Sequence, residues 1–393
     1  MKETKFKDTE LGKIPEEWDY GKFEDYLDKF SAGATPYRGI ASNFIGTIPW
    51  VSSGELNYNY ITDTREHISQ DAQKSTHLTL HPKGTFLIAI TGLEAAGTRG
   101  RCAFIETPAT TNQSCLAIYS TEKMIVEYLF WFYQQWSDYL AFNFSQGSKQ
   151  QSFTAEIVKK LPIYAPSLSE QQRIASALSD ADALVAELDA LIEKKRAIMA
   201  GTMQELLTGK RRLQGFDEPW VERTIEDFAK ITTGASNTQD QAPFGIFPFY
   251  IRSASVMKSN RFLYDCEGVI TIGDGQIGKV FHYVNGKFDL HQRCYLIYDF
   301  YDVDAKFFYY IFSAFFYERA IALSAKATVD SVRRDMIAKM KVDLPSLAEQ
   351  HAIATILSDM DAEIAELEAK RDKYKEVRQG MMQQLLTGKI RLI

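Results

Sequence analysis

The sequence predicts an α+β protein in which two globular domains of mixed α/β structure are separated by two long helices forming an antiparallel coiled coil. Two observations carry this prediction. The segment from Pro166 to Gln214 returns without a gap as Pro345 to Ile393, and a weaker repeat lies upstream of each copy. The two long copies share far more identical positions than amphipathic helices share by chance, so we interpret them as an internal duplication.

The duplication divides the chain into four parts. We predict a first globular domain (1–165), a central helix (166–213), a second globular domain (214–344) and a distal helix (345–393). Each globular domain contains short β-like runs separated by Gly, Pro, Asn and Ser, and each ends in an aromatic helical stretch. The expected strands are Thr85–Thr91, Ser114–Tyr119, Val269–Ile272 and Cys294–Tyr298, and the expected helices are Met124–Phe142 and Ala305–Leu323.

The two globular domains are distant relatives of each other. Gln113-Ser-Cys115 matches Gln292-Arg-Cys294 at the same offset that relates the helices, and Ile48-Pro-Trp50 parallels Phe247-Pro-Phe249. The spacing drifts between these anchors, so loops differ in length while the scaffold persists. Variable loops on a fixed scaffold are typical of a recognition surface.

The repeat also predicts a circular, roughly two-fold arrangement. The first helix continues through Gly209-Lys210 to Trp220, whereas the second ends at Gly388-Lys389. The beginning of the chain, from Gly12 to Trp18, is a shortened form of the same junction. We therefore expect pseudo-two-fold (circular) symmetry, with the two ends of the chain close in space.

A heptad pattern predicts that the two helices pair with each other. Acidic residues dominate the first half of each helix and basic residues the second half, so antiparallel pairing places opposite charges together. The alternative is that these are solvated faces of unpaired helices. The predicted seam comprises Ile174, Leu178, Val185, Leu188, Ile192, Ile353, Leu357, Ile364 and Leu367.

Composition limits the possible functions. The chain has 393 residues, of which 45% are hydrophobic and 13% aromatic, as expected of packed globular domains. The formal net charge of -6 argues against binding nucleic acid by bulk electrostatics alone. Four scattered cysteines indicate buried, reduced thiols in a cytoplasmic protein. The charged start and the short apolar runs predict neither a signal peptide nor a membrane partner.

Familiar catalytic patterns are weak or missing. Gly273 to Lys279 matches GxGxxG, but Val280 follows Lys279 where a phosphate loop needs Ser or Thr. A surface turn is therefore favoured over a nucleotide-dependent enzyme, which would have to bind ATP. His77 and His81 lack a third metal ligand. The sequence has no HExxH, no GxSxG and no Asx-Pro-Pro-aromatic motif of an amino-methyltransferase, so we expect no catalytic residues, no metal and no bound cofactor.

Polar loops at corresponding places in the two halves are the candidate binding surface. Their Arg, Lys, Gln, Ser, Thr and Tyr side chains can bond to base edges and to phosphates, although each loop alone is more commonly only solvated. The candidates in the first half are Thr35, Tyr37, Arg38, Ser52, Ser53, Arg99, Arg101, Ser148, Lys149 and Gln150. The candidates in the second half are Arg252, Lys258, Asp274, Gln276, Lys279, Lys326, Arg333 and Arg334.

With these features, the sequence resembles the specificity subunits of type I restriction-modification systems. The resemblance rests on Gly33-Ala-Thr35-Pro36, on the Pro-x-Leu-x-Glu-Gln-x-x-Ile opening of both helices, and on their Leu-Thr-Gly-Lys ending. The second half departs from the pattern, because Gly234-Ala-Ser-Asn lacks the Thr-Pro pair and Lys326-Ala replaces Gly-Ser.

The resemblance implies a function. Each globular domain is similar to a target recognition domain that reads one half of a bipartite site in double-stranded DNA, and the coiled coil sets the gap between the half-sites. Such a subunit is not catalytic and binds no cofactor. It docks two modification subunits, which methylate adenine with S-adenosylmethionine, and restriction subunits, which use ATP and Mg. The resemblance implies a prokaryotic cytoplasmic protein that is nucleoid-associated when on DNA.

The competing hypothesis is a coiled-coil scaffold whose globular domains bind protein and do not bind DNA. The acidic net charge and the polar second halves of the helices favour this alternative slightly.

Overall fold

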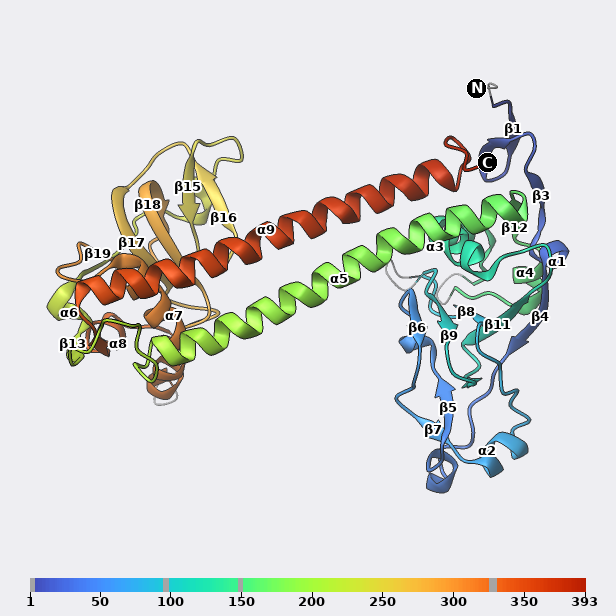
Figure 1. Ribbon diagram of the computed structural model, residues 1–393, viewed down its shortest axis with the longest axis horizontal. Helices are drawn as coiled ribbons and strands as arrows, with labels where there is room; N and C mark the ends of the chain where they lie inside the picture. The colour runs from blue at the N-terminus through green and yellow to red at the C-terminus, as the bar shows by residue number, and fades with distance from the viewer. Residues whose placement is uncertain (1–3, 95–98, 148–150, 325–330) are drawn as a thin grey trace. The chain divides into compact units, whose positions relative to one another are not determined.

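The structure, a computed structural model, describes residues 4–94, 99–147, 151–324 and 331–393. It contains two compact units, the first formed by Met1–Glu187 with Arg371–Ile393 and the second by Leu188–Lys370. Helices α5 (Leu168–Leu206) and α9 (Leu347–Leu385) each contribute one half to either unit (Figure 1). None of the helices in the described ranges combines the length and apolarity that crossing a bilayer requires.

A five-stranded sheet forms the centre of the first unit. Its order is β4-β11-β8-β9-β6, in which the first four strands are antiparallel neighbours and β6 joins β9 in parallel. The strands are β4 (Leu27–Ala32), β6 (Asn59–Ile61), β8 (Phe86–Ala89), β9 (Cys102–Ile105) and β11 (Cys115–Ser120). Strands β8 and β9 are buried throughout, which explains their continuous apolar sequences.

Smaller elements surround this sheet. Strands β1 and β2 form a hairpin, β3 pairs with β12, and β10, β5 and β7 form a three-stranded sheet. Their bounds are β1 (Phe6–Thr9), β2 (Gly12–Pro15), β3 (Asp19–Lys22), β5 (Ile48–Val51), β7 (His67–Ile68), β10 (Thr110–Thr111) and β12 (Pro162–Ala165). The helices are α1 (Phe23–Tyr26), α2 (Gln70–Ser75), α3 (Val126–Phe144), α4 (Ala155–Lys159) and the 3-10 turns η1 (Ala41–Phe44) and η2 (Ser53–Glu55).

Helix α3 is buried on most of its surface because it packs on both the sheet and α5. Its residues 128–133 are all buried, and they share one hydrophobic core with Ile174 and Leu178 of α5. The indole nitrogen of Trp131 donates to the hydroxyl of Ser179 on α5 at 3.2 Å. The aromatic run of this helix is therefore explained by contact on several sides.

The second unit repeats this plan with a six-stranded sheet of order β14-β19-β17-β18-β15-β16. Its first four strands are again antiparallel neighbours, and β15 joins β18 in parallel. The strands are β14 (Lys230–Thr233), β15 (Phe247–Tyr250), β16 (Val256–Ser259), β17 (Tyr264–Ile272), β18 (Phe281–Leu290) and β19 (Cys294–Tyr298).

The remaining elements of the second unit also have counterparts in the first. Strand β13 (Val221–Thr224) pairs with β20 (Lys341–Leu344), as β3 pairs with β12. The helices are α6 (Ile225–Phe228), α7 (Ala305–Ser324), α8 (Arg334–Ala338) and the 3-10 turn η3 (Thr238–Asp240). Phe308, Phe312 and Phe316 of α7 stack along one face and pack in the core that contains Leu206 of α5 and Leu357 of α9.

Each long helix begins with a Gln that fastens it to the preceding chain. In the first unit, the amide of Gln171 donates to the carbonyl of Pro166 at 2.9 Å and accepts from the N–H of Ile125 at 2.8 Å. In the second unit, Gln350 donates to the carbonyl of Pro345 at 2.9 Å and accepts a hydrogen bond at 2.9 Å from the N–H of the residue before α7. Both Gln side chains are buried, so these hydrogen bonds satisfy polar groups that burial would otherwise leave unpaired.

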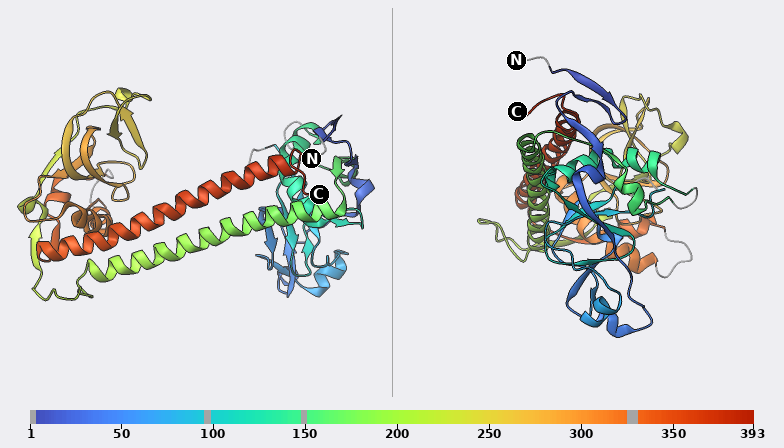
Figure 2. Two further views of the ribbon diagram at one scale, coloured as in Figure 1. Left: turned by 45° about the horizontal axis from the view of Figure 1, so that its top comes forward. Right: turned by 90° about the vertical axis from the view of Figure 1, so that its right-hand side faces the viewer.

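The Glu before each Gln forms a buried ion pair with the tail of the other long helix. In the first unit, Glu170 is 3% exposed and accepts from Arg391 at 2.7 and 2.8 Å. Trp18 also donates to Glu170, at 3.1 Å, and its ring lies 5.6 Å from the guanidinium of Arg391. Both ends of the chain lie in this unit, and Arg391 also reaches Glu17 at 3.3 Å (Figures 1 and 2).

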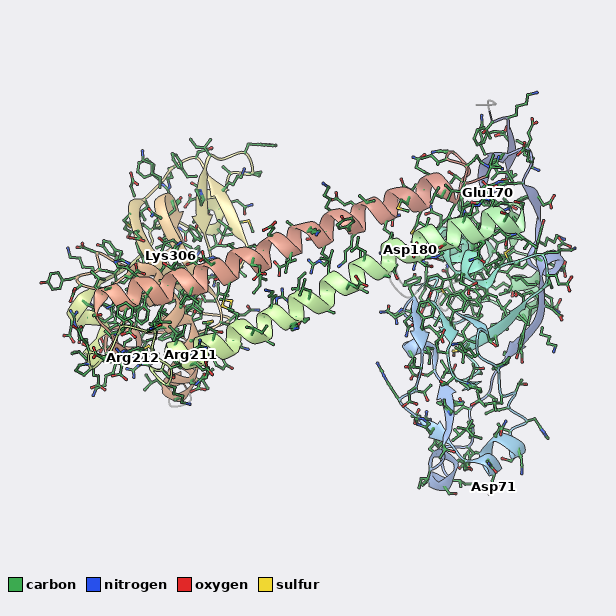
Figure 3. The ribbon with its side chains drawn as sticks, in the orientation of Figure 1. Asp71, Glu170, Asp180, Arg211, Arg212 and Lys306 are labelled. Carbon is green, nitrogen blue, oxygen red and sulfur yellow. The ribbon has the colours of Figure 1, made fainter. Side chains whose placement is uncertain are left out.

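The second unit contains the same buried Glu–Arg ion pair at the continuous junction after α5, but the indole nitrogen of Trp220 makes no hydrogen bond to the carboxylate. Glu349 is 1% exposed and accepts two hydrogen bonds of 2.7 Å from Arg212. The guanidinium of Arg212 lies 5.7 Å from the ring of Trp220, and the backbone of Gly209 approaches the same ring. Figure 3 labels Glu170 at the start of α5 and Arg212 beyond its end.

The observed elements agree closely with the expected ones, and most bounds differ by a few residues. Strand β8 is shorter than the expected Thr85–Thr91, β11 begins and ends one residue later than Ser114–Tyr119, and α3 begins and ends two residues later than Met124–Phe142. Strand β19 has the expected bounds, and α7 extends the expected helix by one residue. Strand β17 begins at Tyr264, five residues before the expected Val269, because its first part pairs with β18 in a long hairpin. Alternate residues of that first part are exposed, so a continuous apolar run does not mark it.

We expect Arg391→Ala to destabilise the first unit by about 3–5 kcal/mol, because the substitution leaves the carboxylate of Glu170 buried without its cationic partner. Urea unfolding followed by tryptophan fluorescence measures this, since four of the tryptophans lie in the first unit. Glu170→Gln in the Arg391→Ala background should recover much of the loss. Lys159→Ala, which breaks an exposed ion pair with Glu156, is the control and should leave the midpoint nearly unchanged. Equal midpoints for Arg391→Ala and wild type would contradict the role assigned to this pair.

Candidate nucleic-acid interface

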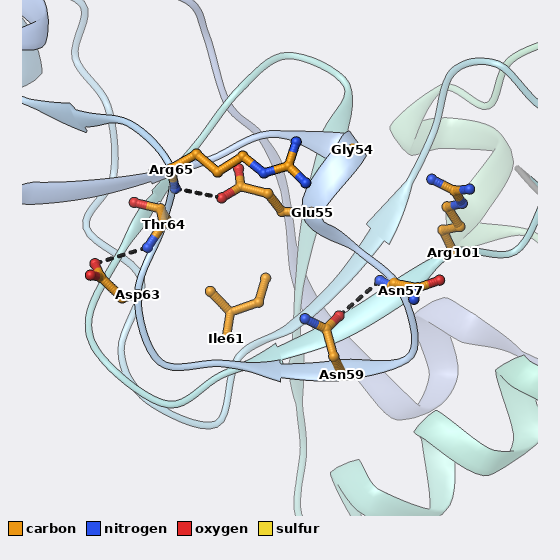
Figure 4. A pocket seen from close by; sticks show the side chains of 9 residues that line it. All are labelled: Gly54, Glu55, Asn57, Asn59, Ile61, Asp63, Thr64, Arg65 and Arg101. Carbon is orange, nitrogen blue, oxygen red and sulfur yellow. Dashed lines mark hydrogen bonds between the residues drawn. The ribbon is translucent and has the colours of Figure 1, made fainter. Parts of the chain in front are cut away.

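A polar hollow of about 580 Å³ lies among the loops of the first unit (Figure 4). Arg101, one of the candidates from the sequence, lines it, and Arg65 and Arg101 lie on opposite sides of it. It is lined by Gly54, Glu55, Asn57, Asn59, Ile61, Asp63, Thr64, Arg65 and Arg101. Guanidinium and amide groups around one hollow suit the hydrogen-bond acceptors of bases and phosphates.

The walls of this hollow are held by hydrogen bonds between side chains and the backbone. Glu55 accepts from the N–H and hydroxyl of Ser52 at 2.8 and 2.7 Å, and from the N–H of Arg65 at 2.8 Å. The side chain of Asn59 accepts from the N–H of Asn57 at 2.8 Å. The carboxylate of Glu55 and the hydroxyl of Ser52 thus have structural partners, which fix the loop that presents Ser53.

Arg38 is engaged within the protein. It donates two hydrogen bonds of 2.8 Å to the carboxylate of Glu66, and its guanidinium lies 4.6 Å from the ring of Phe44 and 5.5 Å from that of Trp50. The hydrogen bond from Arg38 lowers the pKa of Glu66. Arg38 therefore has a structural role in fastening this loop.

Thr35 and Tyr37 lie in the same loop and differ in their surroundings. The hydroxyl of Thr35 forms a hydrogen bond with Gln113, so the Gly-Ala-Thr-Pro segment is joined to the Gln-Ser-Cys anchor. The side chain of Tyr37 is 75% exposed and is available to a partner.

Arg99 and Arg101 are two residues apart but have different environments. Arg99 donates to the carbonyl oxygens of Leu93 and Glu94 at 2.7 and 2.9 Å, so it closes its own loop. Arg101 extends to the hollow (Figure 4). Arg99 thus serves its own loop, and Arg101 lines the hollow.

Three charged side chains meet in the second unit, where the loop after β17 begins. The carboxylate of Asp274, 20% exposed, lies 3.2 Å from Arg252 and 2.6 Å from Arg293. Burial acts to raise the pKa of Asp274, but hydrogen bonds from Arg293 and Arg252 outweigh it and lower that pKa. Asp274 is therefore ionised at neutral pH. A hollow of about 210 Å³ beside it is lined by Thr233, Gly273, Asp274, Gln292, Arg293, Tyr295, Ser331 and Val332.

The loop from Gly273 to Lys279 connects β17 and β18, as the turn interpretation predicted. A Cβ atom on Gly278, which has a φ of 64°, would lie 2.9 Å from the backbone of Tyr317 on α7, so this turn is packed against a helix. Lys279 lies 5.3 Å from the ring of Tyr317. The loop opens a strand, whereas a dinucleotide-binding turn opens a helix.

The other candidates in the second unit are surface residues. Lys258, Gln276, Arg333 and Arg334 are exposed. Ser148, Lys149, Gln150 and Lys326 fall outside the described residues. The sequence interpretation missed Arg65, Asn57 and Asn59 in the first unit and Gln292 and Arg293 in the second. The signal for the last two was present, because Gln292-Arg-Cys294 was recognised as an anchor of the repeat.

His81 and the thiols of Cys102 and Cys115 are buried in the first unit. His81 is buried and forms a 2.7 Å hydrogen bond with Tyr119, and burial lowers the pKa of its imidazole to about 4. Burial raises the pKa of the Cys102 and Cys115 thiols. Within the described ranges, no group of three His, Cys, Asp or Glu side chains could hold a metal ion.

Ion pairs connect the two long helices inside each unit. In the first unit, Asp182 on the acidic half of α5 pairs with Arg378 on the basic half of α9. In the second, Lys195 lies 2.6 Å from Glu363 and Arg196 lies 2.5 Å from Glu368. Of the predicted seam, Leu367 is half-buried and these residues are buried: Ile174, Leu178, Val185, Leu188, Ile192, Ile353, Leu357 and Ile364.

Comparison with known proteins adds a family match. The family model described as Type I restriction modification DNA specificity domain matches residues 15–195 and 217–376. The MjaIX type I restriction enzyme specificity subunit of Methanocaldococcus jannaschii is 36% identical over 188 residues, which cover 47% of this chain but only 42% of that relative. The putative MjaX specificity subunit of the same organism is 25% identical over an alignment covering 100% of this chain and 98% of the relative.

Solved structures share the fold. A crystal structure of the S subunit of a type I restriction-modification system from M. genitalium has a TM-score of 0.68 at 14% identity, covering 94% of this chain and 96% of that one. A chain from a study of complex assembly in a type I R-M system has a TM-score of 0.57 at 15% identity, covering 96% of this chain and 99% of that one.

The surroundings of Arg99 and Arg101 predict different effects on DNA binding. Arg101→Ala should weaken binding to all sequences alike and reduce the salt dependence by about one ion, as expected for a phosphate contact. Arg99→Ala should leave the salt dependence nearly unchanged, because two of its nitrogens already serve the Leu93 and Glu94 carbonyls. Titrations of the complex against target and single-base variants at two salt concentrations measure both effects. A loss confined to one base pair for Arg101→Ala would show base reading, and wild-type behaviour of both variants would show that the DNA-facing surface lies elsewhere.

Proposed function

We propose that this chain, which belongs to the type I restriction modification DNA specificity family, is the sequence-recognition subunit of a type I restriction-modification complex. The observation that carries the proposal is the duplicated architecture. Two units share the same four-strand order and the same connections to the long helices, yet they present different polar side chains on their loops. A protein of this kind can read two different half-sites with one scaffold.

Each globular part would read one half of a bipartite double-stranded DNA target. The hollow of the first unit offers Arg65, Arg101 and Asn57, and the second unit offers Arg252 and Arg293. These side chains match the acceptors that bases present in the major groove. The net charge of -6 is compatible with this role if partner subunits supply much of the phosphate contact.

The long helices would form an antiparallel coiled coil with pseudo-two-fold symmetry that sets the gap between the half-sites. The pairing of acidic with basic halves inside each unit supports this arrangement. The repeated contact between a buried Glu at one helix start and an Arg beyond the other helix end supports it as well. Parallel pairing would place like charges together.

The chain would act without catalytic residues or a cofactor of its own. In the proposed complex it docks two modification subunits, which carry S-adenosylmethionine, and restriction subunits, which use ATP and Mg. In that role the chain would be expressed together with these subunits and assemble with them in the cytoplasm. The alternative is a scaffold that binds proteins but not DNA, and domain exchange distinguishes it from the proposed function.

Domain exchange tests the division of labour between the two units. Replacing residues 1–165 with the corresponding segment of a relative should change one half-site of the methylated sequence and leave the other half-site and the gap intact. Methylome sequencing of cells that coexpress the chain with its modification subunit measures this. Cells with either subunit alone are the control and should show no methylation at the site. Binding of modification subunits without any methylated target would favour the scaffold alternative.

Shortening the helices tests whether they set the gap. Deleting one heptad within Ala183–Ile192, together with its equivalent within 362–371, preserves the heptad phase and removes about 10 Å of helix. The half-site sequences should stay the same while the gap shrinks by about three base pairs at roughly 3.4 Å each. Deleting four residues instead breaks the phase and should abolish activity. An unchanged gap in a folded, active seven-residue variant would contradict the spacer role.

A further inference from the structure

The backbone shows that Ser114 and Arg293 occupy equivalent positions in the two units. In the first unit, the N–H of Ile90 donates to the carbonyl of Ser114 at 2.9 Å. In the second, the N–H of Gly273 donates to the carbonyl of Arg293 at 2.8 Å. Both residues precede the cysteine that begins the second strand of the shared order, β11 or β19.

Thr91 and Asp274 form a second equivalent pair. Thr91 makes an isolated antiparallel bridge with Ser152, and Asp274 makes the same kind of bridge with Ser331. Each follows directly after the residue whose N–H makes the hydrogen bond described above. The side chains of Thr91 and Asp274 therefore start from matching points of the two scaffolds.

Ser53 and Arg252 form a third pair. The carbonyl of Val51, at the end of β5, accepts a main-chain hydrogen bond of 2.9 Å from the segment after β10. The carbonyl of Tyr250, at the end of β15, accepts one of 3.0 Å from the segment after β18. Ser53 and Arg252 each lie two residues beyond these carbonyls.

The chemistry at these three positions differs completely between the units. The first unit has hydroxyl groups, from Ser53, Thr91 and Ser114, and the second has Arg252, Asp274 and Arg293. Arg252 is 44% exposed and Arg293 is 62% exposed, whereas Asp274, which lies between them, is 20% exposed. The two guanidinium groups are thus exposed to solvent, and the carboxylate that binds both of them is largely buried.

We propose that Arg252 and Arg293 read guanine in the major groove of the second half-site, and that Asp274 is the positioning residue that aims them. The inference rests on the proposed function and assigns residues to it. Guanine presents two acceptors, O6 and N7, that match the donor fork of arginine. A carboxylate that accepts from both arginines removes rotamer freedom before DNA arrives, which lowers the entropic cost of binding.

The carboxylate also distinguishes base reading from phosphate binding. A phosphate placed against Arg252 and Arg293 would be repelled by Asp274, whose carboxylate lies 3.2 Å from the first guanidinium and 2.6 Å from the second. The edge of a guanine carries no net charge and is not repelled in this way. A pair of arginines that served only phosphates would bind more strongly without the acidic neighbour.

Asp274→Asn tests the assignment in the complex with modification subunits, on the target found by methylome sequencing. Discrimination at guanine-containing pairs of one half-site should fall about ten-fold. Binding to non-target DNA should become stronger and more salt-dependent, because the substitution raises the net positive charge of the surface. A purely structural role would instead weaken binding to all sequences.

Two further variants keep the inference falsifiable. Asp299→Asn is the control. Asp299 forms a different ion pair in this unit, 2.7 Å from Lys230, so the substitution makes the same change in charge elsewhere and should keep full discrimination between bases. Arg293→Lys keeps the charge but loses the fork, so it should lose discrimination with an unchanged salt dependence. Full discrimination by both Asp274→Asn and Arg293→Lys would overturn the inference. A wild-type complex without any sequence preference would instead overturn the proposed function.

Discussion

A buried carboxylate at the start of one long helix, paired with an arginine from the tail of the other, is the interaction on which the architecture depends. Glu170 holds Arg391 in the first unit, and Glu349 holds Arg212 in the second. A buried charge is costly without its partner, so each pair determines which helix ends meet. The neighbouring glutamines, Gln171 and Gln350, fasten the same helix starts to the globular parts. Orientation of the helices and attachment of the domains thus come from adjacent residues.

This geometry explains why the two sequence motifs of the repeat occur together. The Glu-Gln pair opens each helix, and the Gly-Lys-x-Arg segment follows the end of each helix. They meet inside each unit and complete each other's hydrogen bonds. Their duplication is a requirement of the pairing, since each start needs the opposite end.

The sequence was a good guide to elements and a poor one to individual side chains. The periodicity of the helices and the apolar runs Cys294–Tyr298 and Ala305–Leu323 located the observed elements closely, because burial determines these patterns. The ion pair of Arg38 could not be predicted, because its partner Glu66 is distant in sequence and contacts it only in the folded protein. Arg293 was overlooked because it was treated as part of a structural anchor. Its contact with the carboxylate of Asp274, 2.6 Å away, joins residues 19 positions apart, and local sequence does not reveal it.

The unbroken course of α5 has a thermodynamic consequence. Ile174 and Leu178 belong to the core of the first unit, and Leu206 belongs to the core of the second, yet one continuous helix carries all three. A flexible linker would let the units melt independently, whereas a helix shared by two cores couples them. Fraying that begins in one core removes helical hydrogen bonds that the neighbouring turns rely on. Cooperativity between the two units is therefore built into the backbone, without requiring any side-chain contact between their sheets.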